Sequence, residues 1–130
     1  MFPPFNNARD GIFAAAKLIE ILTKTGKSMT ELVSELPKFY SYRQVLEINS
    51  TKIHQLIHEL KSELVKEGED VSQHGLDLRF GKDKEWFVLI HPSNTEPVIR
   101  VIAEAKRESL ARLYCETTTE LLKIINSRLN

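Results

Sequence analysis

The sequence Trp86-Phe-Val-Leu-Ile-His-Pro-Ser-Asn-Thr-Glu-Pro-Val-Ile-Arg-Val-Ile-Ala-Glu104 places a short polar insert between two apolar runs. Residues 86–90 and 98–102 are rich in β-branched and aromatic side chains, which is typical of strands. The insert, residues 91–97, consists mostly of turn-forming residues and has a proline near each end. Because so short a connection joins only antiparallel strands, we expect an antiparallel strand–loop–strand unit here.

The rest of residues 38–130 alternates between strand and helix patterns. Residues 40–48 are β-rich, and residues 53–64 carry apolar side chains at helical spacing. Residues 76–80 alternate as a half-buried strand does. The last helix is expected to turn six side chains inward: Leu110, Leu113, Tyr114, Leu121, Ile124 and Ile125. This order predicts an α+β domain, in which a four-stranded, mainly antiparallel sheet is packed with two helices on one side.

Residues 1–37 are expected to form a helical appendage in front of that domain. Apolar residues recur at steps of three and four from Ile12 to Leu22, and Gly26 then supplies a helix stop. The segment Ser28-Met-Thr-Glu31 has the spacing of a capping box, which begins a second short helix. Two such helices cannot build a core by themselves, so they need a partner.

Composition limits the class of protein. The chain has 130 residues, 42% hydrophobic and 28% charged, which suits one globular domain, or one such domain plus a fragment of another. Its 18 basic and 18 acidic residues cancel, which argues against a nucleic-acid partner. No apolar run approaches the roughly 20 residues of a membrane span, and the start is unlike a signal peptide. With one cysteine and no such segments, we expect a cytoplasmic chain without a membrane partner.

The polar insert combines groups that suit an anion, above all a phosphate. Ser93 and Thr95 offer hydroxyl donors and Asn94 offers an amide, while backbone N–H groups of residues 93–95 can converge on one point. A phosphate monoester is largely dianionic at neutral pH and accepts hydrogen bonds strongly. Arg100 adds a charge-assisted donor if its side chain leans back toward the insert. The alternative is an ordinary polar turn, because these residue types are also the usual residues of turns.

The segment His91-Pro-Ser-Asn-Thr-Glu-Pro97 resembles the phosphate-binding loop in the last domain of the α-D-phosphohexomutases, the phosphomannomutase/phosphoglucomutase family. In that family the loop usually runs Arg-Pro-Ser-(Gly/Asn)-Thr-Glu-Pro and precedes a strand. Residues 5–15 also look like the helix start that closes the family's third domain. The resemblance implies an isomerase that moves a phosphate between C1 and C6 of a hexose through a phosphoserine and a hexose bisphosphate. The residues it implies for the non-reacting phosphate are His91, Ser93, Asn94, Thr95 and Arg100.

The chain departs from the family pattern at His91, where the family usually has arginine. Arginine is permanently charged and grips phosphate with a planar fork, whereas histidine is charged only part of the time. If His91 contacts the phosphate, binding should favour the protonated ring and weaken as the pH rises. The alternative, which the sequence supports equally, is that His91 only ends a strand and contributes little to binding.

Three elements that a complete mutase needs are not in this sequence: a Ser-His catalytic loop, an Asp-Gly-Asp-Gly-Asp-Arg-like magnesium loop and a Gly-Glu-Glu-Ser-Gly-like sugar loop. We therefore expect residues 1–37 to be the tail of the third domain and residues 38–130 to be the C-terminal phosphate-binding domain. Mg²⁺ and the remaining domains would belong to the full-length parent, and this chain alone would be inactive and hold no cofactor. The alternative is a stand-alone binding module for a phosphorylated metabolite or partner.

Three further candidates have a structural interpretation that we favour. His54 and His58 have a spacing that can hold a metal, but two ligands make a poor zinc site. Cys115 lies in an apolar-rich helix and is expected to be a packed side chain rather than a nucleophile. Trp86 could stack on a sugar, but it begins a core strand, so packing is the favoured role.

Overall fold

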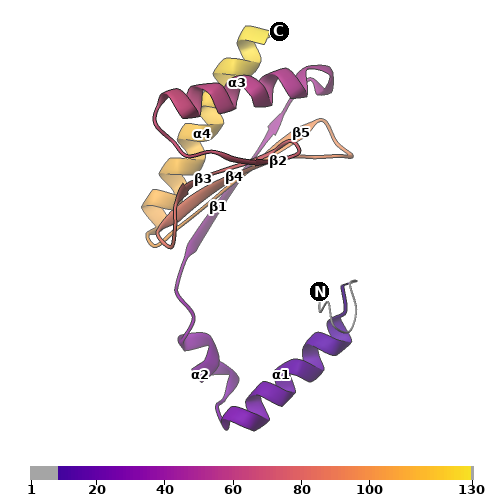
Figure 1. The fold of residues 1–130 in the computed structure, drawn as a ribbon, viewed down its shortest axis with the longest axis vertical. Helices are drawn as coiled ribbons and strands as arrows, with labels where there is room; N and C mark the ends of the chain where they lie inside the picture. The colour runs from indigo at the N-terminus through magenta and orange to yellow at the C-terminus, as the bar shows by residue number, and fades with distance from the viewer. Residues whose placement is uncertain (1–8, 130) are drawn as a thin grey trace. The chain divides into compact units, whose positions relative to one another are not determined.

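The computed structural model describes residues 9–129 and divides the chain into two compact units, Met1–Pro37 and Lys38–Asn130. The ribbon in Figure 1 follows the chain from the helices of the first unit to the sheet and helices of the second.

The N-terminal unit contains the two helices that the sequence predicts. Helix α1 (Gly11–Thr25) begins at Asp10, whose carboxylate accepts a hydrogen bond from the N–H of Phe13 at 2.8 Å. It ends at Gly26, which has a φ of 65°, the left-handed conformation that glycine adopts without strain. Helix α2 (Met29–Ser34) begins with the predicted capping box of Ser28 and Glu31. The backbone N–H of Ser28 holds the pKa of the Glu31 carboxyl below its usual value.

These two helices have no core of their own. Within residues 11–34, all of which the structure describes, neither helix contains a buried residue. Ile12 and Ile19 are 88% and 63% exposed, although they lie at helical spacing on α1. The described residues of this unit, 9–37, therefore leave an apolar surface of α1 uncovered. Part of the segment that resembles the family's third domain, residues 5–8, lies outside the described residues.

The C-terminal unit is an α+β fold built on one antiparallel sheet. Its strands are β1 (Tyr40–Glu47), β2 (Ser72–His74), β3 (Asp77–Lys82), β4 (Trp86–Pro92) and β5 (Val98–Ala105). They lie in the order β1-β5-β4-β3-β2, and every neighbouring pair is antiparallel. The fold class is confirmed, with one correction: the sheet has five strands rather than four. The additional strand, β2, is a three-residue edge strand that is exposed throughout, so it lacks the apolar alternation that reveals the others.

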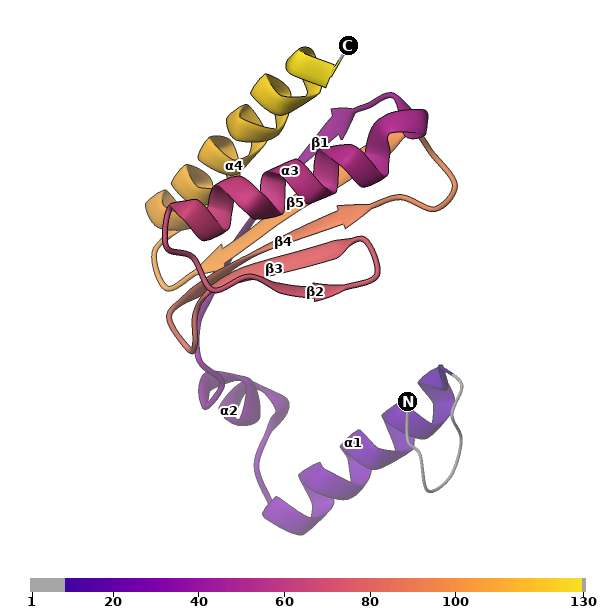
Figure 2. The same cartoon turned by 45° about the horizontal axis from the view of Figure 1, so that its top comes forward.

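Two helices cover one face of this sheet, as Figure 2 shows. Helix α3 (Ile53–Lys66) follows a 3₁₀ turn, η1 (Ser50–Lys52), and helix α4 (Glu108–Leu129) closes the unit. The buried side chains of α3 are Leu56, Ile57, Leu60 and Leu64, all members of the predicted stripe. On the sheet, the core side chains alternate with exposed ones, and the largest buried members include Leu78, Val88, Ile90, Ile99 and Val101.

The inner face of α4 differs from the prediction in part. Leu113 and Ile124 are 50% and 47% exposed, so both lie toward solvent. The buried face of α4 instead consists of Ala111, Cys115, Thr118, Thr119, Leu122 and Ile125. Thr119 is accommodated because its hydroxyl donates to the carbonyl of Cys115 at 2.7 Å, which satisfies its polar group within the helix.

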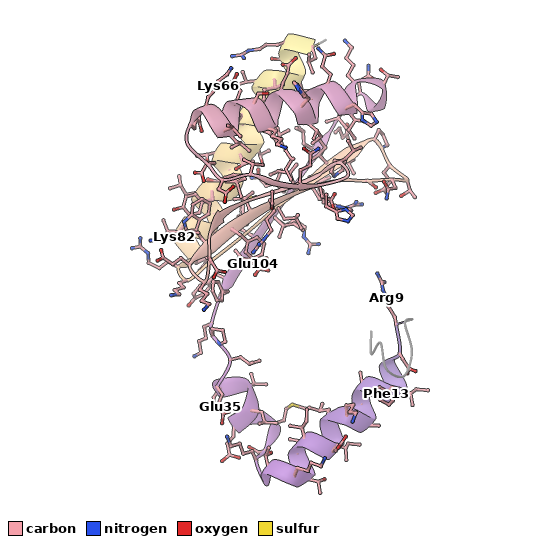
Figure 3. The ribbon with its side chains drawn as sticks, viewed as in Figure 1. Arg9, Phe13, Glu35, Lys66, Lys82 and Glu104 are labelled. Atoms are coloured by element: carbon pink, nitrogen blue, oxygen red, sulfur yellow. The ribbon has the colours of Figure 1, made fainter. Side chains whose placement is uncertain are left out.

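The opposite face of the sheet has no helix of this unit on it. Because side chains alternate along a strand, the neighbours of Leu78, Ile90 and Val101 point away from the core. Figure 3 shows Glu104 of β5 on the side of the sheet away from Lys66 of α3. This open face therefore carries polar and charged side chains from several strands, and the loop between β4 and β5 lies at one end of it.

Candidate functional site

The β4–β5 loop is tied down at its base by three backbone hydrogen bonds. The N–H of Ser93 donates to the carbonyl of Val98 at 2.9 Å, and the N–H of Val98 donates to the carbonyl of Glu96 at 2.8 Å. The N–H of Ile48, just after β1, donates to the carbonyl of Pro97 at 2.9 Å. Residues 94–97 are exposed beyond this base, where the loop projects past the ends of the strands in Figure 2. A loop held in this way loses less conformational entropy when it binds a ligand.

The hydroxyl groups of the loop lie together but bond to each other weakly. The Oγ of Ser93 and the Oγ1 of Thr95 are 3.5 Å apart, and the N–H of Thr95 reaches the same Oγ at 3.5 Å. Both distances are longer than those of strong hydrogen bonds, so these donors remain available to a better acceptor. Asn94 lies between them and is exposed. The structure therefore brings Ser93 and Thr95 to one point, as the sequence analysis expected of a donor cluster.

His91 and Arg100 are brought together by strand pairing. They are opposite each other in the β4–β5 register, next to the buried pair Ile90 and Val101, and so lie on the open face. The guanidinium of Arg100 donates to the Oε2 of Glu96 at 2.7 Å. Glu96 thus holds the guanidinium of Arg100 beside the loop. Arg100 is one-third exposed and retains donors beyond the one used by Glu96.

Asp77 is a neighbour of His91 that no local sequence pattern indicated. Asp77 is the first residue of β3. The next residue, Leu78, pairs with Ile90 of β4, so Asp77 lies opposite His91. The Nδ1 of His91 lies 2.8 Å from the Oδ1 of Asp77. The sequence did contain a signal for this contact. In a hairpin, residues at equal distances from the centre of the turn lie opposite each other, and residues 77 and 91 are equally distant from the turn at residues 83–85. The structure thus gives His91 a definite partner on β3. Contact between His91 and a phosphate stays a prediction.

Trp86 packs, as predicted, rather than offering a free platform for a sugar. Its ring stacks on Tyr114 of α4 with centroids 4.0 Å apart, and Phe80 meets it edge-on at 6.0 Å. Such contacts stabilise the packing of α4 on the sheet.

Sequence comparison matches each of the two units to a domain of one known family. The profile described as "Phosphoglucomutase/phosphomannomutase, C-terminal domain" matches residues 59–121, and "Phosphoglucomutase/phosphomannomutase, alpha/beta/alpha domain III" matches residues 1–40. The chain belongs to the α-D-phosphohexomutase family. The candidate loop of this phosphohexomutase chain lies inside the region that matches the C-terminal domain.

Several curated relatives align with nearly all of this phosphohexomutase chain. A phosphoglucomutase/phosphomannomutase of Thermococcus kodakarensis is 36% identical over 95% of the chain and 26% of its own length. A probable phosphoglucosamine mutase of Methanococcoides burtonii is 33% identical over 97% of the chain and 28% of its own length. A phosphoglucosamine mutase of Bacillus licheniformis is 31% identical over 95% of the chain and 25% of its own length. The chain therefore spans about a quarter of the length of the curated relatives it matches.

The described part of this phosphohexomutase chain does not fit a magnesium site. Across residues 9–129, no group of three or more His, Cys, Asp or Glu side chains could hold a metal ion. The pair His54 and His58 on α3 has no third ligand among these residues.

Among the helices of residues 9–129, none is long and apolar enough to cross a lipid bilayer.

We expect Cys115 to resist alkylation in the folded phosphohexomutase chain. Its side chain is fully buried, and the Sγ–H donates to the carbonyl of Val101 at 3.4 Å. Burial raises the pKa of the Cys115 thiol, so little reactive thiolate forms even at mildly alkaline pH. Iodoacetamide labelling at pH 8, followed by mass spectrometry, should be slow in buffer and complete in guanidinium. Equal labelling rates in both conditions would contradict this picture of the core.

Proposed function

We propose that this chain supplies the distal-phosphate site of a phosphohexomutase that moves a phosphate between C1 and C6 of a hexose. The observation that carries the proposal is the gathering of hydroxyl, guanidinium and imidazole groups at the β4–β5 loop. This gathering occurs within the region that matches the family's C-terminal domain. Anion binding by such convergent donors needs no further group from the chain.

The proposed roles follow from the chemistry of each residue. Ser93 and Thr95 donate from their hydroxyl groups and Asn94 from its amide, while Arg100 contributes a permanent charge from the adjacent strand. The hydroxyl groups of Ser93 and Thr95 would turn from their weak contact with each other to a phosphate oxygen, and Arg100 would use a donor that Glu96 does not occupy. His91 would add a further donor when its ring is protonated. These residues bind and orient the substrate, so a sugar phosphate would be held by the end that does not react.

The two units have different proposed places in the parent enzyme. Residues 1–37 would be the tail of the third domain, a proposal supported by the domain III match and by the uncovered apolar side chains of α1. Residues 38–130 would be the C-terminal phosphate-binding domain. The remaining domains would supply the phosphoserine, the Mg²⁺ ligands and the contacts that choose the hexose. The partners would be hexose phosphate and hexose bisphosphate, and the cytoplasmic location stays a prediction.

An amide NMR titration with mannose 1-phosphate tests the site directly. We expect shift changes confined to residues 91–100 and absent with unphosphorylated mannose. Ser93→Ala should weaken binding roughly tenfold, because it removes a hydrogen bond to a charged group worth about 1.5 kcal/mol. Ser127→Ala, which removes an exposed hydroxyl on α4, is the matched control and should leave affinity unchanged. Equal responses to mannose and its phosphate, or no response at millimolar ligand, would reject the site.

An assay of mutase turnover on the same protein tests the prediction that the isolated chain is inactive. It should show no mutase turnover, because positioning alone does not replace a nucleophile and a metal. Turnover by a rigorously pure chain would overturn this statement without affecting the binding result.

A further inference from the structure

The contact between Asp77 and His91 determines how the imidazole can meet an anion. Both side chains are 40% exposed, and the Nδ1···Oδ1 distance is 2.8 Å. An ionised carboxylate can only accept a hydrogen bond, so the Nδ1 of His91 carries the proton and donates it. This leaves Nε2 as the only polar atom of the ring that is free for a ligand. In the neutral ring, Nε2 presents a lone pair, which repels an anion.

We propose that Asp77 is a positioning residue of the anion site, which fixes His91 so that Nε2 binds an anion by taking up a proton. The inference rests on the proposed phosphate site. In the step, the lone pair of Nε2 forms a bond with a proton from solvent, and the resulting N–H donates to an oxygen of a dianion. Nδ1–H stays on Asp77 throughout, so one proton is gained for each dianion bound.

The charges around His91 leave Asp77 as its direct partner. From β5, Arg100 lies opposite His91, but its guanidinium is bound to Glu96 of the loop. From β3, the guanidinium of Arg79 lies over the ring of Phe87, 4.4 Å from its centroid. From β2, His74 pairs with Asp77 on the far side.

The remaining strand contributes no charge to this row of the sheet. In the row that contains His91, β1 contributes the apolar Val45, while Arg43 and Glu47 lie in the flanking rows. The carboxylate of Asp77 therefore compensates the imidazolium charge that anion binding creates, and the bound ring keeps one orientation.

This arrangement makes anion affinity depend on pH in a way that arginine would not. Only the protonated ring donates from Nε2, so affinity should fall as the pH rises and the ring loses this donor. An arginine at the same position is charged throughout and gives no such dependence. The site thus gains a pH-dependent donor through a pair of residues on adjacent strands.

Inorganic sulfate is the suitable probe, because it stays a dianion between about pH 5.5 and about pH 8.5 and has no proton to give. Its affinity for the 130-residue chain is measured by NMR across this range, together with ¹⁵N spectra of the histidine rings. We expect the wild type to lose affinity as pH rises, and His91→Arg to bind with a flat profile. Asp77→Asn should abolish the Nδ1–H tautomer of His91. His74→Asn, a histidine one strand away, should keep the wild-type profile.

The outcomes separate this inference from the proposed function. If neither sulfate nor mannose 1-phosphate binds to the wild type or to His91→Arg, the proposed phosphate site is overturned, and this inference with it. Binding with the same pH profile in the wild type and His91→Arg would overturn only the role of the pair. An Nε2–H tautomer in the neutral wild type would overturn the positioning role of Asp77, whatever the affinity.

Discussion

Replacing Gly81 with alanine is expected to destabilise the C-terminal unit by about 3 kcal/mol. Gly81 lies in β3 opposite Phe87 and has a φ of 143°, in the region that side chains rarely adopt. A Cβ at this position would lie 2.5 Å from the carbonyl oxygen of Trp86 and 2.6 Å from the Cα of Phe87. Both atoms are backbone, so the strand pair itself has to move. The β3–β4 hairpin carries Asp77 and His91, so the site would lose its geometry together with the fold.

Urea unfolding followed by the fluorescence of Trp86, the only tryptophan, measures this effect where it occurs. Gly68→Ala is the matched control, because Gly68 also has a positive φ, 91°, but open space around its added Cβ. The control should cost only about 1 kcal/mol, the strain of the backbone conformation alone. A loss for Gly81→Ala no larger than that of Gly68→Ala would show that the close contacts relax without cost.

Replacing Arg100 with glutamine is expected to weaken mannose 1-phosphate binding by roughly ten- to a hundredfold, the effect of losing a charge-assisted hydrogen bond of about 1.5–3 kcal/mol. Arg100 is opposite His91 on the open face, and Glu96 holds its guanidinium at the loop. Glutamine keeps the length of the stem in part but removes the charge and the planar fork. The loss should shrink as ionic strength rises, because salt screens an exposed pair.

Arg43→Gln separates a local contact from the general field of the protein. Arg43 lies on β1 opposite Ile102, on the same face but one row farther from the loop than Arg100. It should reduce affinity little at physiological salt. Similar losses from both substitutions would indicate that Arg100 acts through overall charge rather than through contact with the phosphate.

The sequence predicts the parts of the fold whose side chains alternate or repeat clearly. The stripe of α3, the stop at Gly26 and the capping box at Ser28 are all confirmed, because each depends on local chemistry. Strand β2 was missed because it is short, polar and exposed. It is held by contacts outside its own sequence, such as the bond from the Ser72 hydroxyl to the carbonyl of Arg79 at 3.0 Å.

The error on α4, and the contact at His91 that the sequence did not reveal, both depend on tertiary arrangement rather than on local pattern. Hydrophobicity alone favoured Leu113 and Ile124 as inner residues, whereas the geometry of the helix on the sheet buries Thr118 and Thr119 instead. For the site, the loop residues form a continuous string and could be recognised locally. Asp77 lies 14 positions before His91, and only the register of the β3–β4 hairpin brings the two together.

The order β1-β5-β4-β3-β2 also has a consequence for the order in which the sheet can be made. Strands β2 to β5 each pair with a neighbour in the chain, but β1 is the first strand of this sheet to be synthesised and pairs with the last. Even its closest-spaced partners, Glu47 and Val98, have α3 and three strands between them. Closing that loop carries an entropic cost that local hairpins avoid. Within this sheet β1 pairs only with β5, so it has to wait until α3 and the three intervening strands have been made.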